Sequence, residues 1–351
     1  MSSSQPAPIP PQGILVDMVI GGWRAKVLAE VSALDVADVL HHHGPATSAE
    51  LVQQHGVKAN PEALERCLRA CAAMGVFSED VEGRFGPTAM SEPLTTNSAV
   101  SVKNLVACFG SNAFYRGLTG LTRTIQTGRP HMRDVLGMEW WDYLNANPQE
   151  LELFGEAMKS NSIASLQGLL NGCDFSSSKK IADIGGGFGH LTVALLEKYP
   201  NLHGVVLDLP TLIPIAKERM KLNDVSVASR LEYVGGDMFS SVPPADTYIF
   251  KHIIHDWDDE HCVRVLQNCH STMQGDGRII CIDSVVPPMG DSGGLAAKVT
   301  DIVMMTFIAG KERTKIQWER LFKDAGFHIS AITPLTDNIG TSIVEGVKSH
   351  R

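Results

Sequence analysis

The 351-residue sequence lacks an apolar run long enough to cross a bilayer, which takes about 18 residues. Its N-terminus also lacks a charged region followed by an apolar block, the pattern of a secretory signal. Residues 1–12 are instead rich in Ser, Pro and Gln and are predicted to form a disordered tail. We therefore expect a cytoplasmic protein with no membrane partner.

Positive charge is also scarce, since 30 Lys and Arg residues against 39 Asp and Glu residues give a formal net charge of -9. This charge disfavours nucleic acid as a partner, because phosphate binding needs a basic surface. CxxC pairs are missing as well, and the seven scattered cysteines are predicted to be reduced thiols. Cys262 and Cys269, each next to a histidine, lack the spacing of zinc ligands, so we expect no metal.

What the sequence does contain, at 44% hydrophobic residues, is enough apolar material for two cores. Residues 13–100 form the first predicted domain. Apolar residues recur at helical spacing over 22–40, capping signals start helices after Thr47 and Asn60, and a hairpin follows near Phe77 and Phe85. Helices followed by a hairpin are typical of a winged helix. Because the helix over 61–73 has no cationic excess, we interpret the domain as a dimerisation module rather than a DNA-binding one.

Residues 101–170 are predicted to be a helical connecting segment that also contributes to a substrate pocket. Phe154 and Met158 are spaced i, i+4 within it, which suits a pocket lining as well as bundle packing. From residue 171 to 351, predicted strands over 181–184, 205–208, 231–234, 247–251, 279–282, 329–332 and 342–346 alternate with helices. This order predicts an α/β fold, a Rossmann-like, doubly wound and mostly parallel sheet with ligands at the carboxyl ends of its strands.

A glycine-rich turn follows the first of these strands. Gly185, Gly186, Gly187 and Gly189 let the backbone pass close to a ligand, and Asp208 ends the next strand, where it can accept hydrogen bonds from ribose hydroxyls. Dinucleotide-binding enzymes use a similar layout. Asp183, just before the turn, would repel a pyrophosphate but attract an ammonium or a sulfonium. The turn therefore favours S-adenosylmethionine as cofactor.

Polar side chains follow the later strands of the predicted sheet too. After the third strand, Asp237 can accept from an adenine amino group while Met238 and Phe239 cover the ring, although a turn Asp is a plausible alternative. After the fourth strand come Lys251 and, four residues on, His255. The fifth strand is followed by Asp283.

His255 is the side chain predicted to transfer a proton, because a neutral imidazole can take the proton of a phenol as the phenol attacks. The alternative is a histidine at the start of a helix near Trp257 that Asp256 would cap. Asp258, Asp259 and Glu260 resemble a helical ligand set for a metal, but an acidic first turn is already favoured by the helix dipole.

Five ordered motifs resemble the metal-independent small-molecule O-methyltransferase family of plant phenylpropanoid and bacterial aromatic-polyketide pathways. They are the runs 183–189, 208–210, 235–239, 251–260 and 310–314. The resemblance covers nearly the whole chain. It implies a homodimer formed through the N-terminal domain, and His255 as the general base with Asp283 and Glu312 beside it. The plant pattern usually has Glu in place of Asp283, which is one methylene shorter.

The resemblance also implies contacts with cofactor and substrate. For the cofactor these are Asp183, Gly185, Gly187, Asp208, Leu209, Asp237, Met238, Phe239 and Lys251. For the substrate pocket they are Phe154, Met158, Asn161, Asp256, Met304, Met305 and Phe307, with the last three on a helix after Asp301. The hypothesis is methyl transfer to a hydroxyl, expected to be phenolic, of a small aromatic substrate. The same scaffold doing hydroxylation or rearrangement is one alternative, and a winged-helix regulator that senses a small molecule is another.

Overall fold

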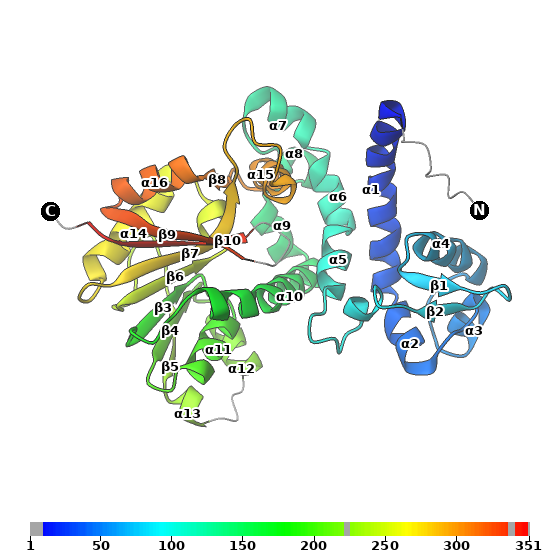
Figure 1. Ribbon diagram of the computed structural model, residues 1–351, viewed down its shortest axis with the longest axis horizontal. Helices are drawn as coiled ribbons and strands as arrows, with labels where there is room; N and C mark the ends of the chain where they lie inside the picture. The colour runs from blue at the N-terminus through cyan, green and yellow to red at the C-terminus, as the bar shows by residue number, and fades with distance from the viewer. Residues whose placement is uncertain (1–9, 221–224, 336–340, 350–351) are drawn as a thin grey trace, which may run out of the picture. The chain divides into compact units, whose positions relative to one another are not determined.

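The computed structural model describes residues 10–220, 225–335 and 341–349. The chain forms two compact units (Figure 1). The first contains residues up to Arg116 together with Leu144–Asn161, and the second contains Gly117–Tyr143 together with Ser162 onward. In the part of the chain that is described, no helix combines the length and the apolar character that a membrane span requires.

The first unit begins with two helices where the sequence predicts one. Helix α1 (Pro11–Ala33) ends before Asp35, which has a left-handed backbone (φ 59°), and α2 (Val36–His43) follows. No Gly or Pro marks this break, so the prediction of a single helix over 22–40 was wrong. Because α1 starts at Pro11, the end of the predicted tail is helical, whereas residues 1–9 lie outside the described part.

The rest of this unit follows the predicted pattern. A capping box of Thr47 and Glu50 starts α3 (Ser48–Gln53), and Asn60 caps α4 (Pro61–Ala73). Strands β1 (Phe77–Glu79) and β2 (Phe85–Pro87) pair antiparallel. One apolar core joins them to α2, α3 and α4 through side chains such as Leu40, Leu51, Leu68, Phe77 and Phe85.

The segment between the two predicted domains is helical, as expected, but broken into short pieces. They are α5 (Lys103–Phe109), α6 (Asn112–Leu118), α7 (Leu121–Thr127), α8 (Met132–Leu136), α9 (Trp140–Ala146) and α10 (Pro148–Gly172). The short helix η1 (Glu92–Leu94) precedes them, within the first predicted domain. The division between the two units passes through α6, α9 and α10.

The second unit is built on an eight-stranded sheet with the order β5-β4-β3-β6-β7-β10-β9, and β8 pairs with β7. The predicted strands are all present; β6 has the predicted bounds and the others run slightly longer than expected. They are β3 (Lys180–Ile184), β4 (His203–Asp208), β5 (Leu231–Gly235), β6 (Thr247–Lys251), β7 (Arg278–Val286), β9 (Phe327–Pro334) and β10 (Thr341–Lys348). The short strand β8 (Arg313–Thr314) was not predicted.

Parallel pairing runs from β5 to β7, and β10 is antiparallel to both β7 and β9. From β3 the chain moves outward to β4 and β5 and then returns to place β6 on the other side of β3. This reversal is the topological switch point where open α/β sheets bind ligands, at the carboxyl ends of the strands. The fold thus predicts a ligand-binding site at the carboxyl ends of β3, β4 and β6.

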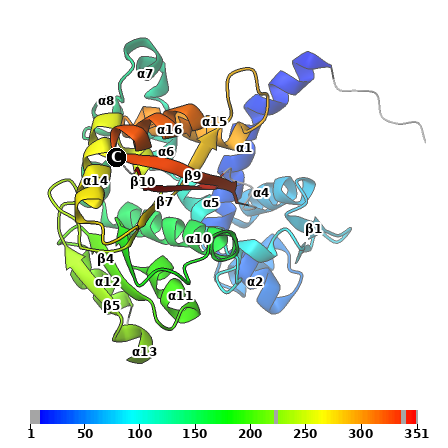
Figure 2. The same cartoon turned by 60° about the vertical axis from the view of Figure 1, so that its left-hand side comes forward.

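Alternate strand residues feed two cores, one on each face of the sheet. Ala182 and Ile184 pack with α14 (Asp259–Thr272) and α16 (Lys315–Asp324), as Trp318 in the same cluster shows. Ile181 packs on the opposite face with α11 (His190–Lys198) and the end of α10. Figures 1 and 2 show these helices covering the two faces. Buried on both sides, the central strands are held rigidly, which fixes the side chains at their ends.

Smaller helices complete this unit. They are α12 (Ile213–Arg219), α13 (Val225–Ala228), η2 (Ile254–Asp256) and α15 (Leu295–Phe307). Because α15 starts at Leu295, Asp301 lies within this helix and not before it as the sequence suggested.

Candidate active site

The glycine turn after β3 leaves open space beside an acid. Gly187 has a left-handed backbone (φ 60°), and no atom lies within 4 Å of where a Cβ would be. Its N–H donates to Asp208 at the end of β4 (2.8 Å), and the N–H of Leu209 donates to the other carboxylate oxygen (2.7 Å). Carboxylate oxygens keep further acceptor positions after one such bond each, so Asp208 remains able to bind hydroxyl groups.

Asp183 lies beneath this turn. It is only 1% exposed and accepts a hydrogen bond from Thr192 (2.8 Å). A Cβ on Gly186 would come within 2.6 Å of the Asp183 carboxyl carbon, so only glycine fits there. Burial outweighs the hydrogen bond and the attraction of Lys251 and raises the pKa of Asp183 to about 6. Asp183 therefore carries an incompletely compensated negative charge at neutral pH.

The turn after β5 places a third acid near an aromatic pair. Asp237 is exposed and accepts from the N–H of Phe239 (3.0 Å) and from the Ser240 hydroxyl (2.7 Å), and these two bonds lower its pKa. Phe239 packs edge-on against Trp257, with ring centroids 4.7 Å apart. Met238 is half-buried beside them at the edge of the core. Leu209 is 63% exposed, and Lys251 at the end of β6 donates to the Ser162 hydroxyl (3.0 Å).

His255 sits in η2, just beyond β6, among three carboxylates. Its Nδ1 is 2.8 Å from Oε1 of Glu312 and 3.5 Å from Oδ1 of Asp283, and its Nε2 is 3.3 Å from Oδ1 of Asp256. Burial alone would lower the pKa of His255. The charge of Asp283, the hydrogen bond to Glu312 and the charge of Asp256 outweigh it and raise this pKa to about 10. His255 is therefore a stronger base than a free imidazole.

Asp283 lies inside β7 rather than after it, which corrects the expected end of that strand. It is fully buried, and neither of its carboxylate oxygens has a hydrogen-bond partner. Burial, together with the charges of Glu312 and Asp256, raises the pKa of Asp283 to about 7, although His255 opposes this. Glu312 is also nearly buried, so two acids flank the imidazole in a dry environment.

The loop that carries Glu312 is fixed by close backbone approach. A Cβ on Gly310 would lie 2.1 Å from the carbonyl oxygen of His255, and the Lys311 N–H donates to that same oxygen (2.9 Å). Asp301 on α15 accepts from the Glu312 N–H (2.8 Å). The glycine thus lets the loop reach η2 and present Glu312 to Nδ1 of His255.

Sequence reasoning assigned no role to two further residues near His255. Arg313 is fully buried and donates to the carbonyl oxygens of Ile254 and Trp257, both at 2.8 Å, so it ties η2 to β8. Its burial depends on the two-residue strand β8, which has no sequence signal. His252 follows Lys251 directly, and its Nδ1 lies 3.6 Å from Asp283. Its place immediately after a predicted strand was a signal that the prediction did not use.

The helix after this site starts later than the alternative with Asp256 as its cap required. Asp258, not Asp256, caps α14 by accepting from the His261 N–H (2.9 Å), which leaves Asp256 beside His255. Asp259 forms ion pairs with Lys311 (2.7 Å) and Arg313 (2.9 Å). Asp258 and Asp259 therefore each have partners within the protein.

The residues expected to line a substrate pocket lie on two elements. Met304, Met305 and Phe307 are on α15, and Phe307 is buried edge-on against Trp140 with ring centroids 4.9 Å apart. Phe154, Met158 and Asn161 are half-buried on the part of α10 that belongs to the first unit. Their contact with a substrate stays a prediction.

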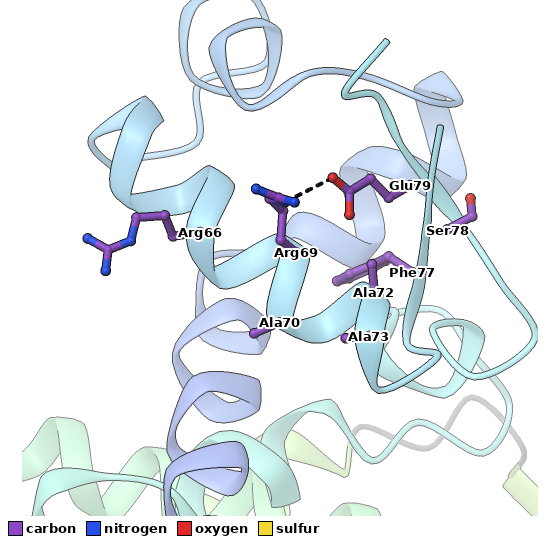
Figure 3. A pocket seen from close by; sticks show the side chains of 8 residues that line it. All are labelled: Arg66, Arg69, Ala70, Ala72, Ala73, Phe77, Ser78 and Glu79. Carbon is purple, nitrogen blue, oxygen red and sulfur yellow. Dashed lines mark ion pairs between the residues drawn. The ribbon is translucent and has the colours of Figure 1, made fainter. Parts of the chain in front are cut away.

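The first unit has a surface hollow of about 800 Å³ over α4 and β1 (Figure 3). Arg66 and Arg69 line it, and Arg69 forms an ion pair with Glu79 (3.0 Å). This ion pair offsets one of the two cations that α4 would offer to a nucleic acid. None of the predicted site residues lines the hollow.

Comparison with known proteins gives matches over most of the chain. A family profile described as an O-methyltransferase domain matches residues 118–328, and one described as an O-methyltransferase dimerisation domain matches residues 16–97. The chain is 30% identical over 338 residues to the phenazine O-methyltransferase PhzM of Lysobacter antibioticus, covering 96% of each chain. It is 31% identical to the isoflavone 7-O-methyltransferase of Glycyrrhiza echinata, covering 93% of each.

Among solved structures, the chain resembles CalO1, a methyltransferase in calicheamicin biosynthesis crystallised in its SAH-bound form. The TM-score is 0.84 at 31% sequence identity, with 97% of this chain and 100% of the other covered.

Proposed function

Because the chain belongs to the S-adenosylmethionine-dependent O-methyltransferase family, we propose that it methylates a phenolic hydroxyl of a small aromatic compound, with His255 as the general base. The family membership establishes an O-methyltransferase that uses S-adenosylmethionine. The substrate class and the role of His255 are the proposed part. The observation that carries them is the imidazole of His255 held by Glu312 beside the ligand-binding edge of the sheet.

The residues at the strand ends fit S-adenosylmethionine. Asp208 would bind the ribose hydroxyls next to the open space at Gly187, while the Asp237 carboxylate would accept from the adenine amino group with Met238 and Phe239 on the ring. The negative charge of Asp183 beneath the turn suits the cationic amino-acid part, close to Gly185. Leu209 and Lys251 would complete the contacts. When bound, this cofactor supplies an electrophilic methyl group on a sulfonium.

The task left to the chain is to position the acceptor and remove its proton. Glu312 accepts from Nδ1 of His255, so the lone pair of the neutral ring is on Nε2. A phenol has a pKa near 10, and the carboxylates around His255 raise its pKa to a similar value. At neutral pH this raised pKa keeps most of the ring protonated, so the reactive form is the smaller, neutral fraction. Proton transfer from a phenol to the neutral ring is close to balanced, so Nε2 of that form can take the phenol proton as the oxygen attacks.

The first unit contains the family's dimerisation domain, and its surface supports a homodimer. Leu15, Val19 and Trp23 lie at i, i+4 and i+8 on α1 and are 64%, 68% and 67% exposed. An exposed apolar stripe of this kind is typical of a surface that a protein partner covers. The proposal is that a second copy of the chain covers it.

Incubation with methyl-labelled S-adenosylmethionine and a set of phenolic acceptors tests the proposal. Each acceptor has a matched control in which hydrogen replaces the hydroxyl. The expected result is label in the phenol only, with a mass gain of one methylene. A gain of oxygen, or an unchanged mass, would support the alternative of hydroxylation or rearrangement on the same scaffold.

A further inference from the structure

Three potential metal ligands converge just beyond β6. The Nδ1 atoms of His252 and His255 lie 3.6 Å and 3.5 Å from the same oxygen, Oδ1 of Asp283. One ligating atom from each residue lies within 4.8 Å of the other two. The two imidazoles are nearly parallel, with ring centroids 5.4 Å apart and an interplanar angle of 26°. Both rings therefore present a nitrogen to one carboxylate.

These separations suit a shared metal ion better than hydrogen bonds. An N–H···O bond spans about 2.7–3.2 Å, so 3.5 and 3.6 Å are too long. Tetrahedral zinc has bonds of about 2.0–2.2 Å to nitrogen and oxygen, which puts its ligands roughly 3.3–3.5 Å apart. Small side-chain movements would bring the three atoms onto such a tetrahedron.

Asp283 supplies an independent observation. Its side chain is 0% exposed, and both carboxylate oxygens lack a hydrogen-bond partner. A buried carboxylate in this state is costly unless a cation or a donor compensates it. Glu312 adds a second acid whose Oε2 is also buried without a partner. The cluster therefore has more acceptor capacity than the protein itself satisfies.

His252 is held toward this cluster by an unusual backbone. Its φ of 54° is in the left-handed region, which side-chain-bearing residues rarely adopt, and its N–H donates to the Ile282 carbonyl (3.0 Å). Strain of this kind concentrates at ligand-binding sites. The His252 side chain is 17% exposed and that of His255 is 11% exposed, so neither side chain is completely closed off from solvent.

We infer that His252, His255 and Asp283 form a binding site for one divalent transition-metal ion of the zinc type, and that the bound ion inhibits methyl transfer. Two imidazoles and a carboxylate are ligands that suit zinc and cobalt(II), with Glu312 or water as the fourth. Binding of the metal does not depend on the proposed function, whereas the inhibition rests on the role of His255 as base.

The inhibition follows from the tautomer of His255. When the metal-free ring is neutral, a proton on Nδ1 can donate to Glu312, which leaves the free lone pair on Nε2. A metal that binds Nδ1 needs the lone pair of that nitrogen, so Nδ1 loses its proton to solvent and the one proton that the neutral ring retains is on Nε2. There the N–H faces Asp256 at 3.3 Å. Nε2 then cannot accept a proton from the acceptor hydroxyl.

Cobalt(II) titration of the purified full chain, followed by visible d–d absorption, tests the binding without any need for turnover. The variants are His252→Asn and His252→Asp, which both tolerate a left-handed backbone and differ in ligand strength. We expect the wild-type chain to bind one tetrahedral cobalt ion. His252→Asp should retain this binding, whereas in His252→Asn the affinity for cobalt should fall at least tenfold. Because Asp at this position adds repulsion that only the metal relieves, zinc should raise the Tm of His252→Asp.

His43→Asn is the control, because His43 belongs to the exposed run of histidines at the end of α2 and stacks on His55. It should bind cobalt like the wild type. Equal cobalt affinity in His252→Asn and the wild type, or loss of binding in His43→Asn, would overturn the site. Zinc should inhibit methyl transfer by the wild-type protein, and addition of a chelator should restore the activity. Stoichiometric binding at this site without inhibition would overturn the inhibitory role while leaving the assigned methyltransferase activity intact.

Discussion

Oε1 of Glu312 lies 2.8 Å from Nδ1 of His255, while Oδ1 of Asp283 lies 3.5 Å from the same nitrogen. Only the first is a hydrogen bond, so Glu312 is the acid that orients the imidazole. Asp283 acts on the ring through its charge. The two acids therefore differ in their expected contribution to proton transfer.

Glu312→Gln keeps an acceptor for Nδ1 but removes the charge that stabilises the imidazolium. Hydrogen bonds to charged groups contribute about 1.5–3 kcal/mol, so kcat should fall by roughly 10- to 100-fold with little change in KM for the cofactor. Asp283→Asn should lower kcat by less than about tenfold, because no hydrogen bond to His255 is lost. Steady-state kinetics of both variants checks this order, and a larger loss in Asp283→Asn than in Glu312→Gln would contradict it.

Asp183→Asn should stabilise the cofactor-free protein at neutral pH. The pKa of Asp183 is raised from 3.8 to about 6, so the native state holds its proton where the unfolded state has released it. The contribution of Asp183 to the free energy of unfolding is therefore fully present below pH 4, where the group is protonated in both states, and it is lost as the pH rises through about 6. The variant's advantage in the free energy of unfolding should grow over that window to on the order of 2 kcal/mol.

Urea unfolding at several pH values measures this difference. The hydrogen bond from Thr192 can be kept by Asn, so the comparison isolates the charge. The same variant should bind S-adenosylmethionine more weakly, because its cationic part loses a negative partner. A constant stability difference between pH 4 and pH 7 would show that Asp183 is not titrating as described.

Asp208→Asn should weaken cofactor binding. The carboxylate accepts two backbone hydrogen bonds and would accept the ribose hydroxyls, and an amide has one acceptor oxygen instead of two. We expect the Kd for S-adenosylhomocysteine to rise by about 10- to 100-fold. Calorimetry measures it, with His328→Gln on β9 as a control that should bind normally. An unchanged Kd in Asp208→Asn would remove Asp208 from the cofactor site.

Charge on the apolar stripe of α1 should prevent dimerisation. Val19→Asp places a carboxylate between Leu15 and Trp23, where burial against a second copy would be unfavourable. Sedimentation velocity should show a monomer for this variant and a dimer for the wild type. Val81→Asp, at the exposed tip of the hairpin, should stay dimeric. A dimeric Val19→Asp protein would place the interface elsewhere.

The sheet was predictable because its strands are short apolar runs that end in polar residues, as in Val205–Asp208 and Thr247–Lys251. Asp183, Asp208, Asp237 and His255 could be placed for that reason. The break at Asp35 could not, since neither Gly nor Pro marks it. The roles of Arg313 and His252 depend on long-range packing, because β8 pairs with β7 only in the folded sheet and Asp283 reaches His252 from a strand further along the chain.

The measurement closest to the central claim is single-turnover methyl transfer in His255→Gln with an acceptor identified by the labelled screen. The variant should bind S-adenosylhomocysteine with the wild-type Kd and transfer the methyl group about 10²- to 10⁴-fold more slowly, which is the usual contribution of a positioned base. Transfer at the wild-type rate with intact cofactor binding would show that His255 does not take the proton.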